Sequence, residues 1–588
     1  MPGFLGPVVS SLRPYRRRIA VAVAVLVASL AATLAGPALV GWAINDGLVQ
    51  HHSFRVVDIA GAAYVLVSLA YFVFTRVQTL MVSGIGERYL NDLRKRVFSH
   101  LLAQPLAFFE SESSGQLLSR MTADIDVLES LVQSGLSSFV TSIGLFIAVM
   151  VVLFVMSPLL SLVVAVSLVP AIVSAARYRS RSTKAYAEVR ALIGDALASL
   201  DESLAGVRVV QAFRQEQATI ERFKQVNQAQ LEGELATVRL SSRFFPKIEW
   251  SGVMSSVVVL LAGALLVEQH MVTVGTVAAF VLYLANLFTA ITSLSALFDL
   301  LQSSGAALST VYGLLAVGST MVDPDRPSLL PEHGALELEC VDFAYRSATD
   351  EDSQVLDQRL VLEGIDLRVE AGERLALVGP TGGGKSTLAK LAGRLYDPLA
   401  GTVRFGGVDL REVLLAHIRE RIVVLPQEGF LFRGSVLENV ALGRPGATPD
   451  EARAAIAQLG LDEWVASLPG GEATDVGERG SHLSAGERQL VSLARAALTA
   501  PAVLILDEAT SSIDPGTERQ AEAALARLAA GRTVIVVAHR LTAAERADRV
   551  AVVRDGALAE IGSHAELIEA EGHYARLFAA WSGVNLDE

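Results

Sequence analysis

The chain has 588 residues, of which 52% are hydrophobic and 19% charged, and its net charge is −13. A typical soluble chain is about 25% charged, so this composition excludes a wholly soluble protein, and the length indicates two to four domains. The negative charge argues against a nucleic-acid binder, which needs basic surface to neutralise phosphate. The single cysteine, Cys340, excludes an internal disulfide and fits a reducing compartment.

Six apolar stretches are long enough to cross a bilayer, which takes roughly 20 helical residues. The first is too long for the apolar part of a cleaved signal peptide. A connection of only Ser157 and Pro158 joins the third stretch to the fourth, and a short turn around Gln269 joins the fifth to the sixth, so each pair forms a membrane hairpin. The expected spans are residues 19–44, 59–81, 139–156, 159–176, 252–267 and 274–298.

Lysine and arginine residues set the expected orientation of these spans. They gather before the first span and in the two long connections, after the second and fourth spans. By the positive-inside tendency, both connections and both termini lie in the cytoplasm. Apolar residues recur there at helical spacing, as at Leu90, Leu93 and Val97, so the membrane helices are expected to continue outside the bilayer. Separate soluble helical insertions are the alternative.

After residue 298 the pattern changes to that of a soluble domain. Prolines between Asp323 and Pro331 indicate a linker, because a helix cannot run through them. Strand-like runs then alternate with helical segments, which predicts a mainly parallel α/β sheet. These runs are residues 336–343, 374–378, 422–425, 503–506, 533–538 and 551–553. The expected domains are a six-helix transmembrane domain (1–315), a linker (316–334) and a nucleotide-binding domain (335–588).

The run GPTGGGKS, from Gly379 to Ser386, matches the phosphate-binding loop pattern. Its glycines let backbone N–H groups turn toward phosphate oxygens, Lys385 reaches the β- and γ-phosphates, and the Ser386 hydroxyl suits Mg²⁺. A strand before it and a helix from Thr387 after it provide the required context. The expected phosphate-binding residues are Gly379, Pro380, Thr381, Gly382, Gly383, Gly384, Lys385, Ser386 and Thr387.

About 120 residues later a hydrophobic strand ends in Asp507 and Glu508. Asp507 is placed to hold Mg²⁺ through its water shell, and Glu508 to polarise the water that attacks the γ-phosphate. A strand that ends in two acids is also common as a mere surface end, so the pair carries weight only together with other motifs.

The order of motifs resembles the ATP-binding-cassette family, in particular exporter-type half-transporters that fuse a membrane domain to a P-loop α/β nucleotide domain. The run LSAGERQ looks like the family's signature, in which Ser484 and Gly486 clamp the γ-phosphate bound to the opposite subunit. The resemblance also implies roles for four residues that stand in the places of family motifs. Tyr345 would stack on adenine, and Gln427 would be the catalytic, Mg²⁺-linked residue of the Q-loop. Asp514 would belong to the D-loop, and His539 would be the switch histidine.

The membrane half resembles the family as well. Residues 108–124 and 205–223 look like its two intracellular connections, whose short coupling helices dock on the nucleotide domains. The signature departs from the usual pattern at Ala485 and at Glu487, which adds a negative charge near a phosphate-binding helix end. An intact Glu508 beside such a signature slightly favours a heterodimer over a homodimer.

The function implied is ATP- and Mg²⁺-dependent transport, most simply export, of a hydrophobic or amphipathic lipid, drug or peptide across the plasma membrane by a dimer. An importer for a siderophore-like substrate and a non-hydrolysing ATP sensor are the alternatives. Arg76, a charge inside an expected span, either snorkels or meets an anionic substrate group. The acidic stretch 346–362 is expected to be a solvated loop of unassigned role.

Overall fold

The computed structural model describes residues 13–50, 53–112, 114–345, 360–426, 429–507, 515–538 and 541–582. The chain divides into two compact units. The first contains Met1–Leu102 and Gly115–Val317, and the second contains Ala103–Ser114 and Gly318–Glu588. A short segment from the first half of the sequence therefore belongs to the same unit as the second half, and so does the stretch expected to be a linker.

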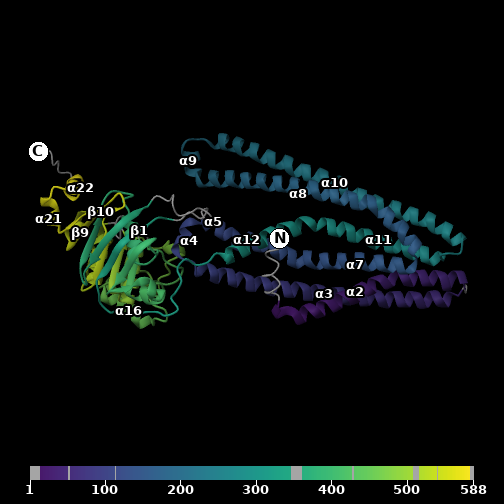
Figure 1. The fold of residues 1–588 in the computed structure, drawn as a ribbon, viewed down its shortest axis with the longest axis horizontal. Coiled ribbons are helices and arrows are strands. Elements are labelled where there is room, and N and C mark those ends of the chain that lie inside the picture. Colours follow the sequence, from purple (N-terminus) through teal and green to yellow (C-terminus); the bar gives the residue numbers. More distant parts are fainter. Residues whose placement is uncertain are drawn as a thin grey trace. The chain divides into compact units, whose positions relative to one another are not determined.

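The first unit is built from helices, several of which are long (Figure 1). Two of its segments, η2 and η3, are π-helical turns, and η1 is a single 3₁₀ turn. In chain order the elements are η1 (Arg13–Tyr15), α2 (Arg16–Trp42), η2 (Ala43–Gln50), α3 (Phe54–Leu102), α5 (Ser114–Met121), α6 (Ala123–Ser130), η3 (Leu131–Gly135), α7 (Leu136–Met156), α8 (Pro158–Ala205), α9 (Val207–Ala212), α10 (Glu216–Glu268), α11 (Val274–Ala296) and α12 (Phe298–Ala316).

Among the described residues, six helical segments are long and apolar enough to cross a membrane, which confirms the expected number. Helix α10 has 53 residues, about 80 Å at 1.5 Å per residue, against a hydrocarbon core about 30 Å thick. Helices α3, α8 and α10 therefore continue well beyond a bilayer without a break, and the alternative of separate helical insertions does not hold for them. The six segments are Arg13–Gln50, Phe54–Leu102, Ala123–Met156, Pro158–Ala205, Glu216–Glu268 and Val274–Ala316.

Two pairs of neighbouring helices organise this unit. Helix α8 runs beside α10, and α2 beside α3 (Figure 1). Between α8 and α10 the rings of Tyr178 and Phe244 stack 4.1 Å apart. Helix α11 lies against α7, α10 and α2, and its Phe280 and Leu284 are fully buried. Apolar packing around α11 thus forms the core of the unit.

Helices α2 and α11 touch backbone to backbone. A Cβ atom on Gly275 would lie 2.1 Å from the carbonyl oxygen of Gly41, so only glycine fits there. The Asn45 side chain accepts a hydrogen bond from the Gly275 N–H at 2.8 Å, which satisfies an N–H in the first turn of α11. Small residues permit such close helix contacts in membranes, where polar groups must find partners inside the protein.

The second unit combines helices with two sheets. Helix α4 (Leu106–Ser111) is its contribution from the first half of the sequence. The strands are β1 (Leu336–Phe343), β2 (Leu362–Val369), β3 (Arg374–Val378), β4 (Ala400–Phe405), β5 (Val408–Asp409), β6 (Ile422–Leu425), β7 (Val503–Asp507), β8 (Thr533–Val537), β9 (Arg549–Arg554) and β10 (Ala557–Gly562). The other helices and turns are α13 (Lys385–Ala392), η5 (Leu410–Glu412), α14 (Leu415–Arg421), α15 (Val436–Ala441), α16 (Pro449–Gln458), α17 (Asp462–Ser467), η6 (Gly471–Ala473), η7 (Glu478–Gly480), α18 (Ala485–Thr499), α19 (Pro515–Ala529), α20 (Leu541–Glu545), α21 (His564–Glu569) and α22 (His573–Ser582).

The larger sheet has the order β10-β9-β3-β8-β7-β6, and β9, β3, β8, β7 and β6 are parallel. All six strand-like runs expected from the sequence form strands, and five of them lie in this sheet. Because parallel strands end at the same edge, the residues that follow β3, β6, β7 and β8 begin at one edge of the sheet. This edge carries the phosphate loop.

A second, four-stranded sheet of order β2-β1-β4-β5 is antiparallel and was not expected. Strands β2, β4, β5 and β10 were also missed. Strand β2 mixes buried with exposed residues, β10 alternates exposed with half-buried residues, and β5 is only two residues long. These strands therefore lack the continuous apolar runs that marked the others. The expected loop 346–362 falls mainly outside the described residues, and its last residue, Leu362, is a buried residue of β2.

Candidate nucleotide-binding site

The phosphate loop connects β3 to α13 in a conformation that requires glycine. Gly379, Gly382 and Gly384 have φ values of 143°, 82° and 103°, which disfavour other residues. A Cβ on Gly379 would also lie 2.0 Å from the carbonyl oxygen of Val553 in β9. The loop therefore packs directly on the sheet, and its backbone is free to approach a ligand at the N-terminus of α13.

Lys385 lies inside this loop and is only 5% exposed. Its ammonium group donates to the carbonyl oxygens of Gly379 and Pro380, both at 2.9 Å. The loop is thus curled around the lysine head group, which is preorganised for phosphate oxygens. A charge held in place before the ligand arrives contributes more than one that must be ordered on binding.

Ser386 and Asp507 meet in space although 121 positions separate them. The Ser386 hydroxyl donates to Asp507 Oδ1 at 3.2 Å, because β8 alone separates β3 from β7 in the sheet and the two strands end at the same edge. A hydroxyl beside a carboxylate is an all-oxygen donor pair of the kind that Mg²⁺ prefers, so these residues fit the ion expected from the sequence.

Tyr345 stands next to the loop. Its hydroxyl lies 2.9 Å from the hydroxyl of Thr387, and its ring meets the rings of Phe343 and Tyr396 edge-on, at 5.0 and 5.4 Å. The side chain is still 39% exposed. A ring fixed at its edges with part of its surface open is suited to stack on a planar base.

Helix α4 packs against this same corner of the unit through Glu110, a residue that sequence reasoning did not single out. The Glu110 carboxylate accepts a hydrogen bond from Lys390 of α13 at 2.8 Å and another from the hydroxyl of Tyr396. The Lys390 ammonium lies 5.8 Å from the ring centres of both Tyr345 and Tyr396. The only sequence hint was the resemblance of residues 108–110 to an intracellular connection.

The surroundings of Glu110 and Lys390 favour the charged form of both side chains. Burial by itself raises the pKa of Glu110, but the hydrogen bonds from Lys390 and Tyr396 outweigh it and hold the pKa below its ordinary value of 4.5. Burial likewise lowers the pKa of Lys390, but Glu110, together with Tyr345 and Asp507, more than offsets this effect, so that the pKa is raised. Both groups therefore stay ionised at neutral pH.

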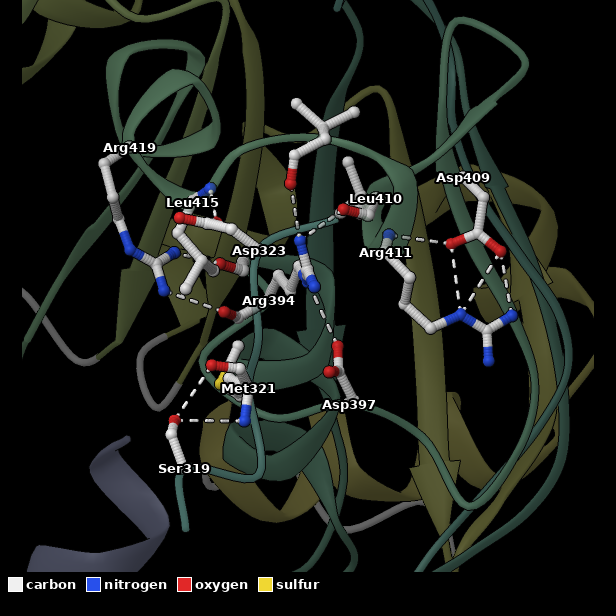
Figure 2. A network of polar contacts seen from close by, with 12 residues as sticks. Ser319, Met321, Asp323, Arg394, Asp397, Asp409, Leu410, Arg411, Leu415 and Arg419 are labelled. Atoms are coloured by element: carbon white, nitrogen blue, oxygen red, sulfur yellow. Dashed lines mark hydrogen bonds and ion pairs between the residues drawn. The ribbon is translucent and has the colours of Figure 1, made fainter. Parts of the chain in front are cut away.

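A buried arginine, Arg394, and a half-buried one, Arg419, secure the far end of α13. Figure 2 shows Arg394, which is 3% exposed, between the carbonyl oxygens of Leu410 and Val413 and the carboxylate of Asp397. The guanidinium of Arg419 donates to the carbonyl oxygens of Gly393 and Arg394 at 2.6 and 2.7 Å. Cations at the C-terminal end of a helix satisfy its last carbonyls and favour its dipole, so both ends of α13 are held.

The signature serine begins α18. Ser484 and Glu487 form a capping box, in which Ser484 Oγ accepts from the Glu487 N–H and Glu487 Oε2 accepts from the Ser484 N–H at 2.8 Å. Gly486 is buried in the first turn. In the described part of the chain, no hydrogen bond joins Ser484 or Gly486 to the phosphate loop of this chain.

Four expected site residues, Gln427, Glu508, Asp514 and His539, lie outside the described residues. In the sequence they follow strands β6, β7 and β8. Their roles stay predictions. The described residues Tyr345, Gly379–Thr387 and Asp507 do come together.

The departure at Glu487 has a structural explanation, because its carboxylate caps α18. Arg488, which could have neutralised it, donates instead to the carbonyl oxygen of Leu483 at 3.0 Å. The substitution Glu487→Gln keeps the acceptor and removes a negative charge from the phosphate-binding helix end. Charges at a helix N-terminus contribute about 0.3–1 kcal/mol, so we expect a two- to fivefold lower KM for ATP.

Steady-state ATP hydrolysis by the purified protein in lipid checks this expectation. Glu566→Gln is the matched control, because Glu566 forms the same capping box at the start of α21 with Ser563. An unchanged KM in Glu487→Gln, or an equal change in both variants, would contradict the effect of the charge.

Fold and site together define a class: a multi-pass membrane protein with a fused P-loop unit that binds ATP. The model of the ABC transporter transmembrane region matches residues 19–291, and that of the ABC transporter ATP-binding region matches residues 362–511. An uncharacterized ABC transporter ATP-binding protein of Bacillus subtilis (strain 168) is 32% identical over 579 residues, covering 97% of this chain and 93% of that protein. The chain therefore belongs to the ABC transporter family, with membrane and ATP-binding regions in one polypeptide, and is an ATPase-coupled transporter of the exporter type.

Two further proteins are similar to this chain over most of its length. A fatty acid ABC transporter ATP-binding/permease protein of Mycobacterium bovis (strain ATCC BAA-935 / AF2122/97) is 34% identical over 526 residues, covering 90% of this chain and 81% of that protein. The structure of a bacterial Atm1-family ABC exporter with ATP bound is similar with a TM-score of 0.82 at 26% identity, over 97% of this chain and 99% of that one.

Proposed function

We propose that this chain is one half of a dimeric pump that uses ATP hydrolysis to export a hydrophobic or amphipathic substrate across the plasma membrane. The observation that carries the ATP-driven part is the cluster of Lys385, Ser386 and Asp507 at one edge of the sheet, with Tyr345 beside it. The apolar composition of the six membrane segments supports the substrate class.

In this proposal the residues of the site act mainly by positioning. Tyr345 stacks on the base, the loop N–H groups and Lys385 hold the phosphates, and Glu508 orients the attacking water. Ser386 and Asp507 would hold Mg²⁺, with Gln427 as a further contact. The bound ion would neutralise charge that develops on the phosphate oxygens. His539 would complete the site on the γ-phosphate side, and Asp514 would complete it at the subunit boundary.

A second half-transporter is part of the proposal. Within the described ranges, Ser484 and Gly486 make no hydrogen bond to the phosphate loop of their own chain, in keeping with a signature that serves a partner's nucleotide. Helix α9, in the second intracellular connection, is followed by the exposed ring of Phe213 and carries the exposed side chain of Val209. Such an apolar surface suits burial against another subunit. The charge of Glu487 slightly favours a partner of different sequence.

The proposed direction and substrate class rest on charge and on similar proteins. Basic residues in both long connections support a cytoplasmic location for these connections and for both termini. The exporter of known structure supports outward transport, and the fatty acid transporter supports an apolar substrate. Membrane lipids are the expected surroundings of the six spans.

The experiment that tests this function compares wild type with Glu508→Gln, each purified alone and with a candidate second half-transporter, in lipid vesicles. A general base typically contributes about 10²–10⁴-fold, so we expect ATP hydrolysis to fall by at least about 100-fold in the variant. Activity of the chain alone would indicate a homodimer, and activity that appears only with the partner a heterodimer. Hydrolysis that persists in Glu508→Gln would contradict the assigned chemistry.

The direction of transport is measured in vesicles of the same composition in which the protein has the inside-out orientation. Accumulation of a labelled apolar substrate inside vesicles whose ATP-binding units face outward supports export. Depletion from the lumen would instead support the importer. ATP binding without hydrolysis in wild type would support a sensor.

A further inference from the structure

The membrane unit contains a cavity of about 400 Å³ that the ATP site does not involve. Helices α2, α3 and α7 and the π-helical turn η3 form its walls, and α6 adds Leu128 and α12 adds Leu308. All of these elements belong to the first unit. The volume lies within the range of small-molecule sites, about 300–1,000 Å³. The cavity is therefore large enough for a ligand.

The chemistry of the walls is apolar. None of the lining residues is charged, and the polar side chains among them are Gln78, Tyr89 and Ser137. The Gln78 amide already donates to Thr141 at 2.8 Å, and the Tyr89 hydroxyl lies 3.0 Å from that of Tyr312. A ligand in this cavity thus gains little from polar groups and mainly from burial of apolar surface.

Local backbone features shape the cavity. A Cβ on Gly86 of α3 would lie 1.9 Å from a methyl group of Val132 in η3, so these segments meet only because residue 86 is glycine. The turn η3 is π-helical over Leu131–Gly135. Such single π turns inside helices are rare and occur frequently at functional sites. This close contact and this unusual turn lie in the wall of the same cavity.

One end of the cavity adjoins a positive charge cluster. Ile19, Ala22, Val23 and Leu26 line it from one face of α2, and helical spacing puts Arg16 on the same face one turn earlier. Arg16, Arg17 and Arg18 are exposed and form no ion pair with the described residues. Of two acids in nearby segments, Glu129 pairs with Arg94 at 2.7 Å. Asp92 accepts a hydrogen bond from the Tyr15 hydroxyl at 2.7 Å and keeps its charge, but the three arginines outnumber it. The end is thus suited to an anionic head group.

We propose that this cavity binds the acyl chain of a free fatty acid, whose carboxylate contacts the arginines at the start of α2. This deepens the proposed function and rests on it, because the fatty acid would be the transported substrate, taken from the cytoplasmic leaflet. The binding itself requires neither ATP nor the partner's signature. Each additional buried CH₂ group strengthens such binding, so longer chains bind more tightly until the cavity is full.

The test is equilibrium binding of radiolabelled palmitate to the full-length protein in detergent without nucleotide. We expect saturable binding that weakens at least tenfold in Ala22→Phe, which fills the cavity from α2. Ala24→Phe is the matched control, because Ala24 is exposed on the same helix and does not line the cavity. Val140→Phe and its control Val151→Phe on α7 repeat the comparison from the opposite wall, in case one variant fails to fold.

The head group is tested by competition. Hexadecanol, which has the same chain length, should compete at least tenfold less well than unlabelled palmitate, and Arg16→Gln should reduce that difference. Binding that does not saturate, or equal losses in each variant and its control, would overturn the proposal. Stronger displacement by phosphatidylglycerol than by palmitate would overturn the free fatty acid in favour of a membrane lipid. Because the binding assay contains no ATP, a failure to bind palmitate is distinguishable from a failure of Glu508-dependent hydrolysis.

Discussion

Lys385→Met is expected to lower ATP hydrolysis by at least about 100-fold, because removal of one preorganised donor typically costs about 10²–10³-fold. Methionine keeps the length and packing of a side chain that is 5% exposed, but it loses the ammonium group that bonds to Gly379 and Pro380. The affinity for ATP should fall as well, since the lysine interacts with the phosphates in the ground state. ATP hydrolysis in lipid and nucleotide binding measure the two effects.

The matched control for this variant is Lys224→Met, at an exposed lysine of α10 that pairs with Glu221. It should leave hydrolysis unchanged. Thermal denaturation of Lys385→Met shows whether the second unit is still folded. A folded Lys385→Met protein that keeps more than a tenth of the wild-type rate would refute the assignment of this loop as the phosphate site.

Substitution of Glu110 or Lys390 should separate ATP hydrolysis from transport. Glu110 of α4 bonds directly to Lys390 of α13, and Lys390 lies over the ring of Tyr345. Helix α4 follows the end of α3 within a few residues, so this contact connects a membrane helix to the nucleotide site through the chain. We expect Glu110→Gln and Lys390→Met each to reduce transport about tenfold while basal hydrolysis falls less than threefold.

The magnitude follows from the coupling energies of contacting residues, about 0.5–3 kcal/mol, since 1.4 kcal/mol corresponds to about tenfold. Transport and hydrolysis are measured in the same vesicles, and the double variant completes the cycle. The exchange Glu110→Lys with Lys390→Glu should recover part of the loss. Ser111→Ala is the control on α4, because its hydroxyl bonds only to the carbonyl oxygen of Phe108. Additive losses in the double variant would argue against this coupling.

The pH dependence of this contact follows from the two pKa shifts. The pKa of Glu110 is lowered, so its contribution is complete above the ordinary value of 4.5 and is lost as the pH falls through the lower value in the folded protein. The pKa of Lys390 is raised, so its contribution is complete below its ordinary value and is lost only at higher, strongly alkaline pH. The contact should therefore be insensitive to pH across the physiological range.

The missed sheet shows where reading the sequence fails. Buried parallel strands such as β3, β7 and β8 are continuous apolar runs, and all were recognised. Strands β2 and β10 place alternate residues on a more exposed face, and their short patterns resemble those of loops. Their pairing depends on partners distant in the sequence, as in Leu336 of β1 with Phe405 of β4. A local pattern contains no information on such a partner.

Patterns of residues close in the sequence predicted much of the nucleotide site. The glycines of the phosphate loop and Lys385 follow one another in the chain, so their spacing alone predicts a phosphate-binding turn. Six long apolar stretches likewise predict six membrane helices, because the bilayer imposes a minimum length on each. These conclusions depend on residues close in sequence. The structure confirms the six helical segments among the described residues, and the phosphate-binding role of the loop stays a prediction.

Only the tertiary structure decided which distant residues meet. It brought Ser386 to Asp507, Tyr345 to Thr387, and Glu110 to Lys390, which is 280 positions away. It also showed that Glu487 caps α18 and that helical segments distant in the sequence line one apolar cavity of the membrane unit. These features depend on the packing of whole elements against one another. The hydrophobic effect that drives such packing is non-directional, so the sequence specifies the apolar faces but not the individual contacts between them.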